Sequence, residues 1–199
     1  FRYRPGRNAA IREVLAETVD RFTVVTDEQG AAIRANGIRV DRTINNAICL
    51  QASAPSEESL AAFRERFQLD GKLTVAIGGR LHELKGVMQV FQMLKLLREE
   101  FPEIRMLALG KEEIYESFRP KAEEFGVDDL VISTGWLDGE ELHCAIASTD
   151  VMLTPSICFE TFGMMNLEAM EFRRPVVATS FGGCPEVVRD GVSGFVANP

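Results

Sequence analysis

The sequence predicts an α/β fold in which helices cover both faces of a parallel sheet. From Leu73 to Ala197, short apolar runs alternate with helix-like segments, an order typical of parallel strands joined by crossover helices. The strand-like runs are apolar at successive positions, as expected of strands buried on both faces. In open sheets of this kind, ligands bind at the carboxyl ends of the strands, near the point where the strand order reverses. The loops that follow the strands are therefore the candidate binding loops.

Six short apolar segments are predicted to be strands: 73–79, 105–110, 130–135, 150–155, 175–180 and 194–197. Helices are predicted between them over 86–100, 113–125, 140–147 and 163–172. In the first of these helices the apolar residues recur at helical spacing, which predicts one buried face: Val87, Val90, Phe91, Leu94 and Leu97. Asp138 is predicted to cap the helix over 140–147.

The first 70 residues follow a different pattern. Helices are predicted over 11–18, 28–36 and 56–67, and a strand over 21–26. Glycine is favoured just after the last residue of a helix, so Gly37 is expected to end the second helix. We assign residues 1–38 to the tail of a preceding domain and its linker, and residues 39–199 to the main domain.

Composition excludes several classes of protein. The net charge of −8 argues against a nucleic-acid-binding domain, because such domains carry a basic surface. The chain starts at Phe1 and shows neither an apolar signal segment nor an apolar stretch of about 18 residues, so we expect a cytoplasmic excerpt of a longer polypeptide. Its two histidines, His82 and His143, argue against a Ser-His-Asp triad and against a histidine-rich metal site.

The four cysteines are widely spaced, and none forms a CxxC pair: Cys49, Cys144, Cys158 and Cys184. This spacing indicates buried thiols in a reducing compartment.

The loop Gly78–Gly86, with the sequence GGRLHELKG, follows the first strand of the main domain. Glycines allow the backbone to approach a ligand closely, and the helix start beyond them offers free N–H groups. Arg80 and Lys85 add two positive charges at this place. Together these features predict a phosphate site, although the loop matches neither GxGxxG nor GxxxxGK[ST]. The alternative is that both cations are solvated loop residues.

A second constellation, Ser156–Glu168, carries two carboxylates eight positions apart, Glu160 and Glu168. Two such groups can bracket a polyhydroxylated ligand, since each accepts hydrogen bonds from hydroxyls. A glutamate on a helix is more often a solvated residue, but Glu168 lies in an otherwise apolar run. A third glycine-rich turn, Ser180–Glu186, also follows a predicted strand.

Three segments, in the order GRLHELKG, PSICFETFGMMNLEAM and RPVVATSFGGCPEVVRDGVSGFV, resemble the C-terminal, donor-binding domain of the GT-B glycosyltransferases of family 4. The resemblance covers about residues 40–199. It implies a Rossmann-like nucleotide-sugar-binding domain over 39–199, truncated before its final helices. Residues 1–38 would then be the tail of the N-terminal acceptor domain.

The resemblance also implies roles for individual residues. Arg80 and Lys85 bind the donor diphosphate and stabilise charge on the leaving nucleotide, while Glu160 faces the transferred sugar and Glu168 binds the ribose hydroxyls. Further substrate contacts are implied for Gly79, for the N–H groups of Phe162, Gly163 and Met164, and, near the base, for Gly135, Trp136 and Leu137. No metal or other cofactor is implied, because the two cations and the helix end neutralise the leaving group.

The implied function is that of a retaining hexosyltransferase that uses a UDP-, GDP- or ADP-linked sugar. The acceptor (a sugar, a lipid or a small molecule) and any membrane contact belong to the missing domain. We therefore expect the chain alone to bind donor without transferring sugar. Two alternatives remain open at this point: a non-catalytic nucleotide-sugar-binding module, and another GT-B enzyme such as a phosphorylase or a sugar-nucleotide epimerase.

Overall fold

A computed structural model describes residues 5–48, 54–79 and 81–198. The chain forms two compact units, Phe1–Ala47 and Ile48–Pro199. The described part of the smaller unit contains α1 (Pro5–Glu17), β1 (Thr23–Val24), α2 (Asp27–Ala35) and β2 (Arg42–Thr43).

The smaller unit extends beyond the predicted boundary at residue 38. Its strands β1 and β2 pair in parallel, with Thr23 opposite Arg42, and the Asn45 side chain donates a hydrogen bond of 2.9 Å to the carbonyl oxygen of Val25. These contacts hold residues 39–47 in the same unit. The paired strand is also shorter than the predicted segment over 21–26, because β2 offers only two residues for pairing.

The larger unit contains every strand and helix that the sequence predicts for it, with ends that differ by a few residues. Its elements are α3 (Glu57–Arg66), β3 (Leu73–Gly78), η1 (Glu83–Lys85), α4 (Val87–Leu97), β4 (Ile104–Leu109), α5 (Glu112–Phe125), η2 (Asp128–Leu130), β5 (Val131–Gly135), α6 (Gly139–Ala147), β6 (Val151–Thr154), α7 (Met164–Glu171), β7 (Val176–Thr179), α8 (Cys184–Val187) and β8 (Gly194–Ala197). The short 3-10 helices η1 and η2 were not predicted.

The six strands of the larger unit form one parallel sheet in the order β5-β4-β3-β6-β7-β8. The chain builds outward from β3 through β4 to β5, and then returns to the other side of β3 to add β6, β7 and β8. The reversal of strand order therefore lies between β3 and β6, where Val75 pairs with Val151. In such sheets the crevice beyond this reversal is the usual ligand site.

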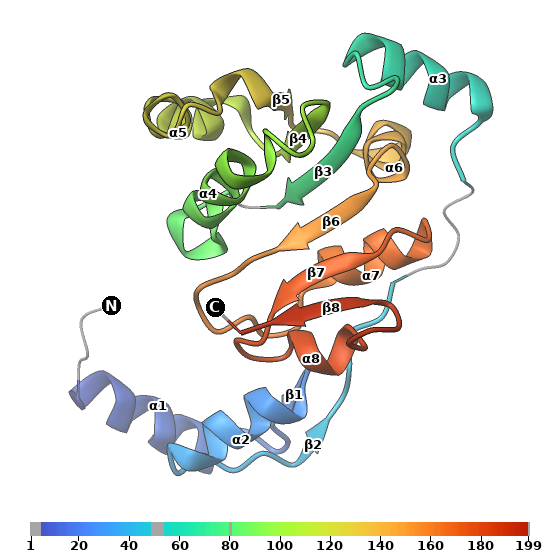
Figure 1. Cartoon of the computed structure of the whole chain (residues 1–199). Helices are drawn as coiled ribbons and strands as arrows, with labels where there is room; N and C mark the ends of the chain where they lie inside the picture. Colours follow the sequence, from blue (N-terminus) through green and yellow to red (C-terminus); the bar gives the residue numbers. More distant parts are fainter. Residues whose placement is uncertain (1–4, 49–53, 80, 199) are drawn as a thin grey trace. The chain divides into compact units, whose positions relative to one another are not determined.

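Helices cover both faces of the sheet, as predicted (Figure 1). Successive side chains of a strand point to opposite faces, and β3 shows this clearly. Val75 and Ile77 belong to the apolar cluster beneath α4 and α5, whereas Ala76 belongs to the cluster beneath α3, α6 and α7. The two buried clusters explain why the strand segments are apolar at successive positions.

The expected pattern in α4 is present, since Val87, Val90, Phe91 and Leu94 are all buried. Asp138 lies at the N-cap position of α6, as predicted, but its side chain accepts no hydrogen bond there.

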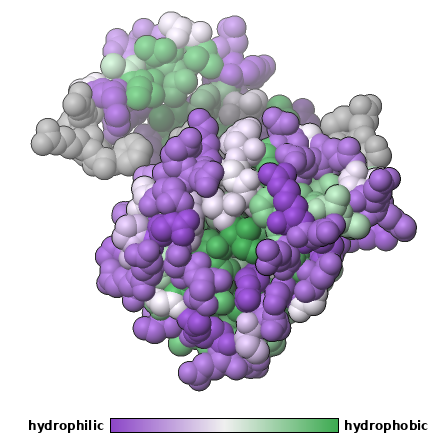
Figure 2. Space-filling model, turned by 90° about the horizontal axis from the view of Figure 1, so that it is seen from above, coloured by the Kyte–Doolittle hydropathy of each residue, from purple (hydrophilic) through white to green (hydrophobic). Residues whose placement is uncertain are grey.

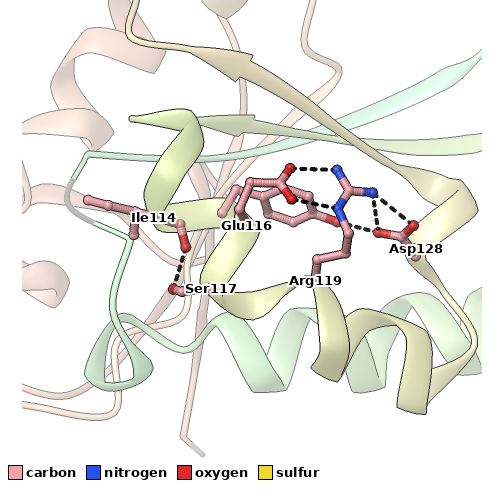
Figure 3. Close-up of polar contacts among 6 residues, drawn as sticks. Ile114, Glu116, Ser117, Arg119 and Asp128 are labelled. Atoms are coloured by element: carbon pink, nitrogen blue, oxygen red, sulfur yellow. Dashed lines mark hydrogen bonds and ion pairs between the residues drawn. The ribbon is translucent and has the colours of Figure 1, made fainter.

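A polar network joins α5 to η2 (Figure 3). The buried Tyr115 hydroxyl donates to Asp128 at 3.0 Å, and Arg119 donates to both oxygens of Asp128 at 3.1 and 3.0 Å. Arg119 also binds Glu116 through two hydrogen bonds of 3.0 and 2.7 Å. Burial, followed by the hydrogen bond to Asp128, raises the pKa of Tyr115, so its hydroxyl remains a donor. The network fixes the segment that leads into β5.

Figure 2 shows the molecule from above the view of Figure 1, on the side where β5 forms the edge of the sheet. On this side the larger unit has a central apolar area bordered by hydrophilic residues. Within the part of the chain that the structure describes, no helix combines the length and apolarity needed to cross a membrane.

The β3–α4 connection ends at Gly86, which lies against the end of β6. Its φ angle is 82°, in the region that residues with a Cβ atom rarely adopt. A Cβ atom built on Gly86 would lie 1.9 Å from the carbonyl oxygen of Pro155. Gly86 thus meets two separate requirements, a left-handed backbone and the absence of a side chain.

We expect Gly86→Ala to destabilise the larger unit by about 2–4 kcal/mol, since backbone strain and steric overlap both contribute. Gly126→Ala is the matched control: Gly126 has a φ of 71° but no heavy atom within 4 Å of its ideal Cβ position, so only the strain of about 1 kcal/mol should remain. Urea unfolding of the two variants checks this difference. If the two variants lose the same free energy of unfolding, the backbone near Pro155 accommodates the new methyl group without any further loss of stability.

Candidate functional site

The connections that follow β3 and β6 meet at the carboxyl edge of the sheet. The backbone N–H of Ile157 donates to the carbonyl oxygen of Leu84 at 2.9 Å. The Lys85 ammonium forms an ion pair with the Glu160 carboxylate, so two predicted site residues from distant segments are in direct contact. Arg80, the other predicted cation, lies outside the described residues.

The Glu160 carboxylate is largely shielded, with its side chain 13% exposed. Ser156 Oγ donates to its Oε2 atom at 3.2 Å. The turn after β7 holds the backbone of Glu160. The Glu160 N–H donates to the carbonyl oxygen of Phe181 at 3.1 Å, and the Gly183 N–H donates to the carbonyl oxygen of Glu160 at 2.7 Å. A Cβ atom on Gly182 would lie 2.2 Å from that oxygen. The glycine-rich turn predicted from the sequence therefore positions Glu160.

Lys85 is the last residue of a single 3-10 turn. His82 caps this turn, because its Nδ1 atom accepts a hydrogen bond of 3.1 Å from the N–H of Leu84. Two backbone bonds close the turn, from Lys85 to His82 at 2.8 Å and from Gly86 to Glu83 at 2.9 Å. No sequence motif points to this capping role of His82.

Gly163 lies at the N-cap position of α7 and, as a glycine, offers no side-chain cap. The first turn of the helix, which includes the N–H of Met164, carries a partial positive charge. Phe162 just before it is buried, so only its backbone can reach a ligand.

Behind this helix start lies a buried polar layer centred on Asn166. Its Oδ1 atom accepts from Thr154 Oγ1 at 2.5 Å, and its Nδ2 atom donates to Cys184 Sγ at 3.6 Å. Thr179 Oγ1 similarly donates to the carbonyl oxygen of Ser156 at 2.5 Å. Sequence analysis assigned these residues no role; the signal for them is the presence of polar side chains within otherwise apolar segments.

A cavity of about 200 Å³ lies at the ends of β3, β4 and β5. It is lined by Gly79, Leu109, Gly110, Trp136, Leu137, Leu142, Met165 and Glu168. Four of these are predicted substrate-binding residues, which come from the connections after β3 and β5 and from α7: Gly79, Trp136, Leu137 and Glu168. The other predicted residues with described positions are Lys85, Gly135, Glu160, Phe162, Gly163 and Met164, and they lie outside the lining of this cavity.

Glu168 is a half-buried carboxylate in this cavity. Burial raises its pKa, and the nearby Glu171 carboxylate raises it further, while His143 opposes both effects. The charged form is therefore held in the fold at a cost in free energy. A carboxylate kept in such surroundings is a strong hydrogen-bond acceptor for ligand hydroxyls.

The described cysteines, Cys144, Cys158 and Cys184, are free thiols. Cys158 is only half-buried, contrary to the expectation that all four are buried. Burial raises the pKa of Cys184 to about 11, so this thiol beside Asn166 remains protonated and is a poor nucleophile. Cys49 lies outside the described residues. Within residues 5–48, 54–79 and 81–198, no three histidine, cysteine or acidic side chains converge as metal ligands.

Residues 61–199 match the family model described as glycosyl transferases group 1. The chain belongs to this family. The resemblance inferred from the three sequence motifs is thereby confirmed.

Two curated relatives illustrate the match. The chain is 32% identical over 151 residues to the GDP-mannose-dependent alpha-(1-6)-phosphatidylinositol monomannoside mannosyltransferase of Mycolicibacterium smegmatis. This match covers 73% of this chain and 40% of the relative. It is 33% identical over 142 residues to a D-inositol 3-phosphate glycosyltransferase of Arthrobacter. That match covers 68% of this chain and 34% of the relative. The chain thus spans less than half the length of these relatives.

Solved structures show the same fold at lower identity. HepE of Anabaena, in complex with UDP and glucose, superposes with a TM-score of 0.88 at 20% identity, over 99% of this chain and 54% of HepE. The C-terminal domain of the group 1 glycosyltransferase LpcC from Francisella tularensis gives a TM-score of 0.64 at 23% identity, over 77% of this chain and 80% of that domain. The fold is that of the C-terminal half of GT-B glycosyltransferases, as the sequence predicted.

The raised pKa of Glu168 leads to a prediction about stability. A carboxyl group whose pKa is higher in the folded state stabilises the fold below its unfolded pKa, and this contribution is lost as the pH rises through the folded value. At pH 7.5, Glu168→Gln should therefore have a higher Tm than the wild type. The difference should disappear near pH 4, where Glu168 is protonated.

Calorimetry across this pH range checks the prediction. Glu65→Gln, which makes the same change on an exposed position of α3, is the matched control and should leave the Tm nearly unchanged. If the Tm rises equally in both variants at pH 7.5, the effect comes from the loss of one negative charge rather than from the burial of Glu168.

Proposed function

We propose that the larger unit binds a nucleotide-diphosphate sugar and provides the donor half of a retaining hexosyltransferase. The observation that carries this proposal is the convergence of Lys85 and Glu160 at the strand-order reversal, beside the cavity that contains Glu168. These three groups suit three parts of one ligand. The cation suits the diphosphate, the shielded carboxylate suits the hexose, and the second carboxylate, in the small cavity, suits the ribose.

The nucleoside part of the ligand occupies the cavity in this proposal. Glu168 accepts hydrogen bonds from the ribose hydroxyls, and Gly79 allows the ligand to approach the end of β3. Trp136 is 67% exposed and lines the cavity, so its ring offers a flat surface for the base. The solved structure of HepE in complex with UDP and glucose supports a nucleotide at this fold.

The diphosphate lies between the cavity and Glu160. Lys85 exchanges part of its ion pair with Glu160 for the phosphate oxygens, Arg80 adds a second cation, and the start of α7 contributes the N–H groups of Gly163 and Met164. As the bond between hexose and phosphate breaks, negative charge grows on the leaving diphosphate. Cations and N–H groups fixed at this position stabilise that charge most in the transition state.

Glu160 then faces the hexose, where its carboxylate accepts hydrogen bonds from sugar hydroxyls. The acceptor is held by another domain, in line with the span of this chain over less than half of its relatives. A nucleotide-sugar-binding module without catalysis has the same binding properties and differs only in turnover.

The role of Lys85 predicts that UDP-, GDP- or ADP-glucose raises the Tm of the chain. Lys85→Ala should weaken binding of the stabilising donor by about 1.5–3 kcal/mol, as expected for a charge-assisted hydrogen bond. Lys121→Ala, which removes an exposed lysine of α5 paired with Glu124, is the control and should bind normally. Calorimetric titration measures the affinity of each variant for the donor. Equal affinities for wild type and Lys85→Ala would remove Lys85 from the diphosphate site.

The role of Glu168 predicts discrimination between ribose and dideoxyribose. The wild type should bind the ribonucleotide more tightly than its 2′,3′-dideoxy analogue, whereas Glu168→Gln should bind the two nearly equally, because the anionic acceptor is lost. A calorimetric cycle with both proteins and both nucleotides isolates this interaction. Discrimination that persists in full in the variant would place the ribose elsewhere.

A further inference from the structure

The turn that presents Lys85 depends on one imidazole nitrogen. His82 Nδ1 accepts the N–H of Leu84 at 3.1 Å, and an imidazole nitrogen can accept a hydrogen bond only when it carries no proton. The cap therefore requires a neutral ring with its proton on Nε2. The His82 side chain provides the N-cap of η1.

The cap lies close to Lys85 along the backbone. Lys85 donates its own N–H to the carbonyl oxygen of His82 at 2.8 Å, so the residue that caps the turn also closes it. Leu84, whose N–H is capped, accepts from Ile157 of the β6–α7 connection at 2.9 Å. Loss of the cap would therefore loosen the backbone that carries the ammonium and its link to the opposite side of the crevice.

We propose that His82 is a positioning residue for Lys85, which holds the ammonium at the donor diphosphate by capping the turn that carries it. The inference rests on the proposed function, since Lys85 must contact the diphosphate for the cap to affect binding. It adds to this site a residue that affects donor affinity through the backbone of the turn rather than through its own charge.

The experiment compares the wild-type chain with His82→Asn, His82→Ala and Lys85→Ala. Asparagine places its Oδ1 atom where histidine has Nδ1, and it is a strong N-cap residue that does not titrate. The probes are UDP-glucose and GDP-mannose. Affinities are measured by calorimetry at pH 8.

At pH 8 we expect His82→Ala to bind about 3–10-fold more weakly than the wild type, by the usual cost of a lost cap, and His82→Asn to bind nearly as well. Hydrogen exchange of the Leu84 N–H, measured without nucleotide, should be faster in His82→Ala and normal in His82→Asn.

Two results would overturn the inference: normal binding by His82→Ala, or no rescue by asparagine. The Lys85→Ala arm separates this failure from that of the proposed function. If Lys85→Ala binds like the wild type, the diphosphate assignment is wrong, whereas a weak Lys85→Ala beside a normal His82→Ala rejects only the role of His82.

Discussion

The carboxyl edge of the sheet depends on the close approach of the β3–α4 and β6–α7 connections. Gly86 allows this approach because it has no side chain to meet the carbonyl group of Pro155, and the hydrogen bond from Ile157 to Leu84 aligns the two segments. Lys85 and Glu160 lie on either side of this contact. Their ion pair is thus a consequence of backbone packing, and it forms between residues separated by 75 positions.

The site also resolves an electrostatic difficulty. A chain of net charge −8 repels an anionic ligand at long range, but salt screens exposed charges over about 8 Å at physiological ionic strength. Binding therefore depends on the few charges nearest the ligand. Lys85 and the start of α7 provide a local positive field, while the ion pair with Glu160 orders Lys85 in the absence of ligand.

The buried polar layer behind α7 supports this arrangement. Asn166 links the end of β6 to the start of α8 through Thr154 and Cys184, and Thr179 of β7 binds the carbonyl oxygen of Ser156. Hydrogen bonds with buried partners are directional and exclude water, so they orient the connection that carries Glu160. Glu168, on the same helix, remains a half-buried carboxylate whose raised pKa reflects a cost to the fold.

The sequence by itself determined the order and type of the strands and α-helices in the larger unit, because apolar periodicity reflects burial on one or both faces of each element. It also proposed Lys85, Glu160 and Glu168 as site residues, from charges in the loops that follow the strands and from a carboxylate within an apolar run. Only the tertiary structure decided which of these meet. The pairing of Lys85 with Glu160 and the cap formed by His82 depend on three-dimensional approach and on side-chain direction, which local sequence patterns do not encode.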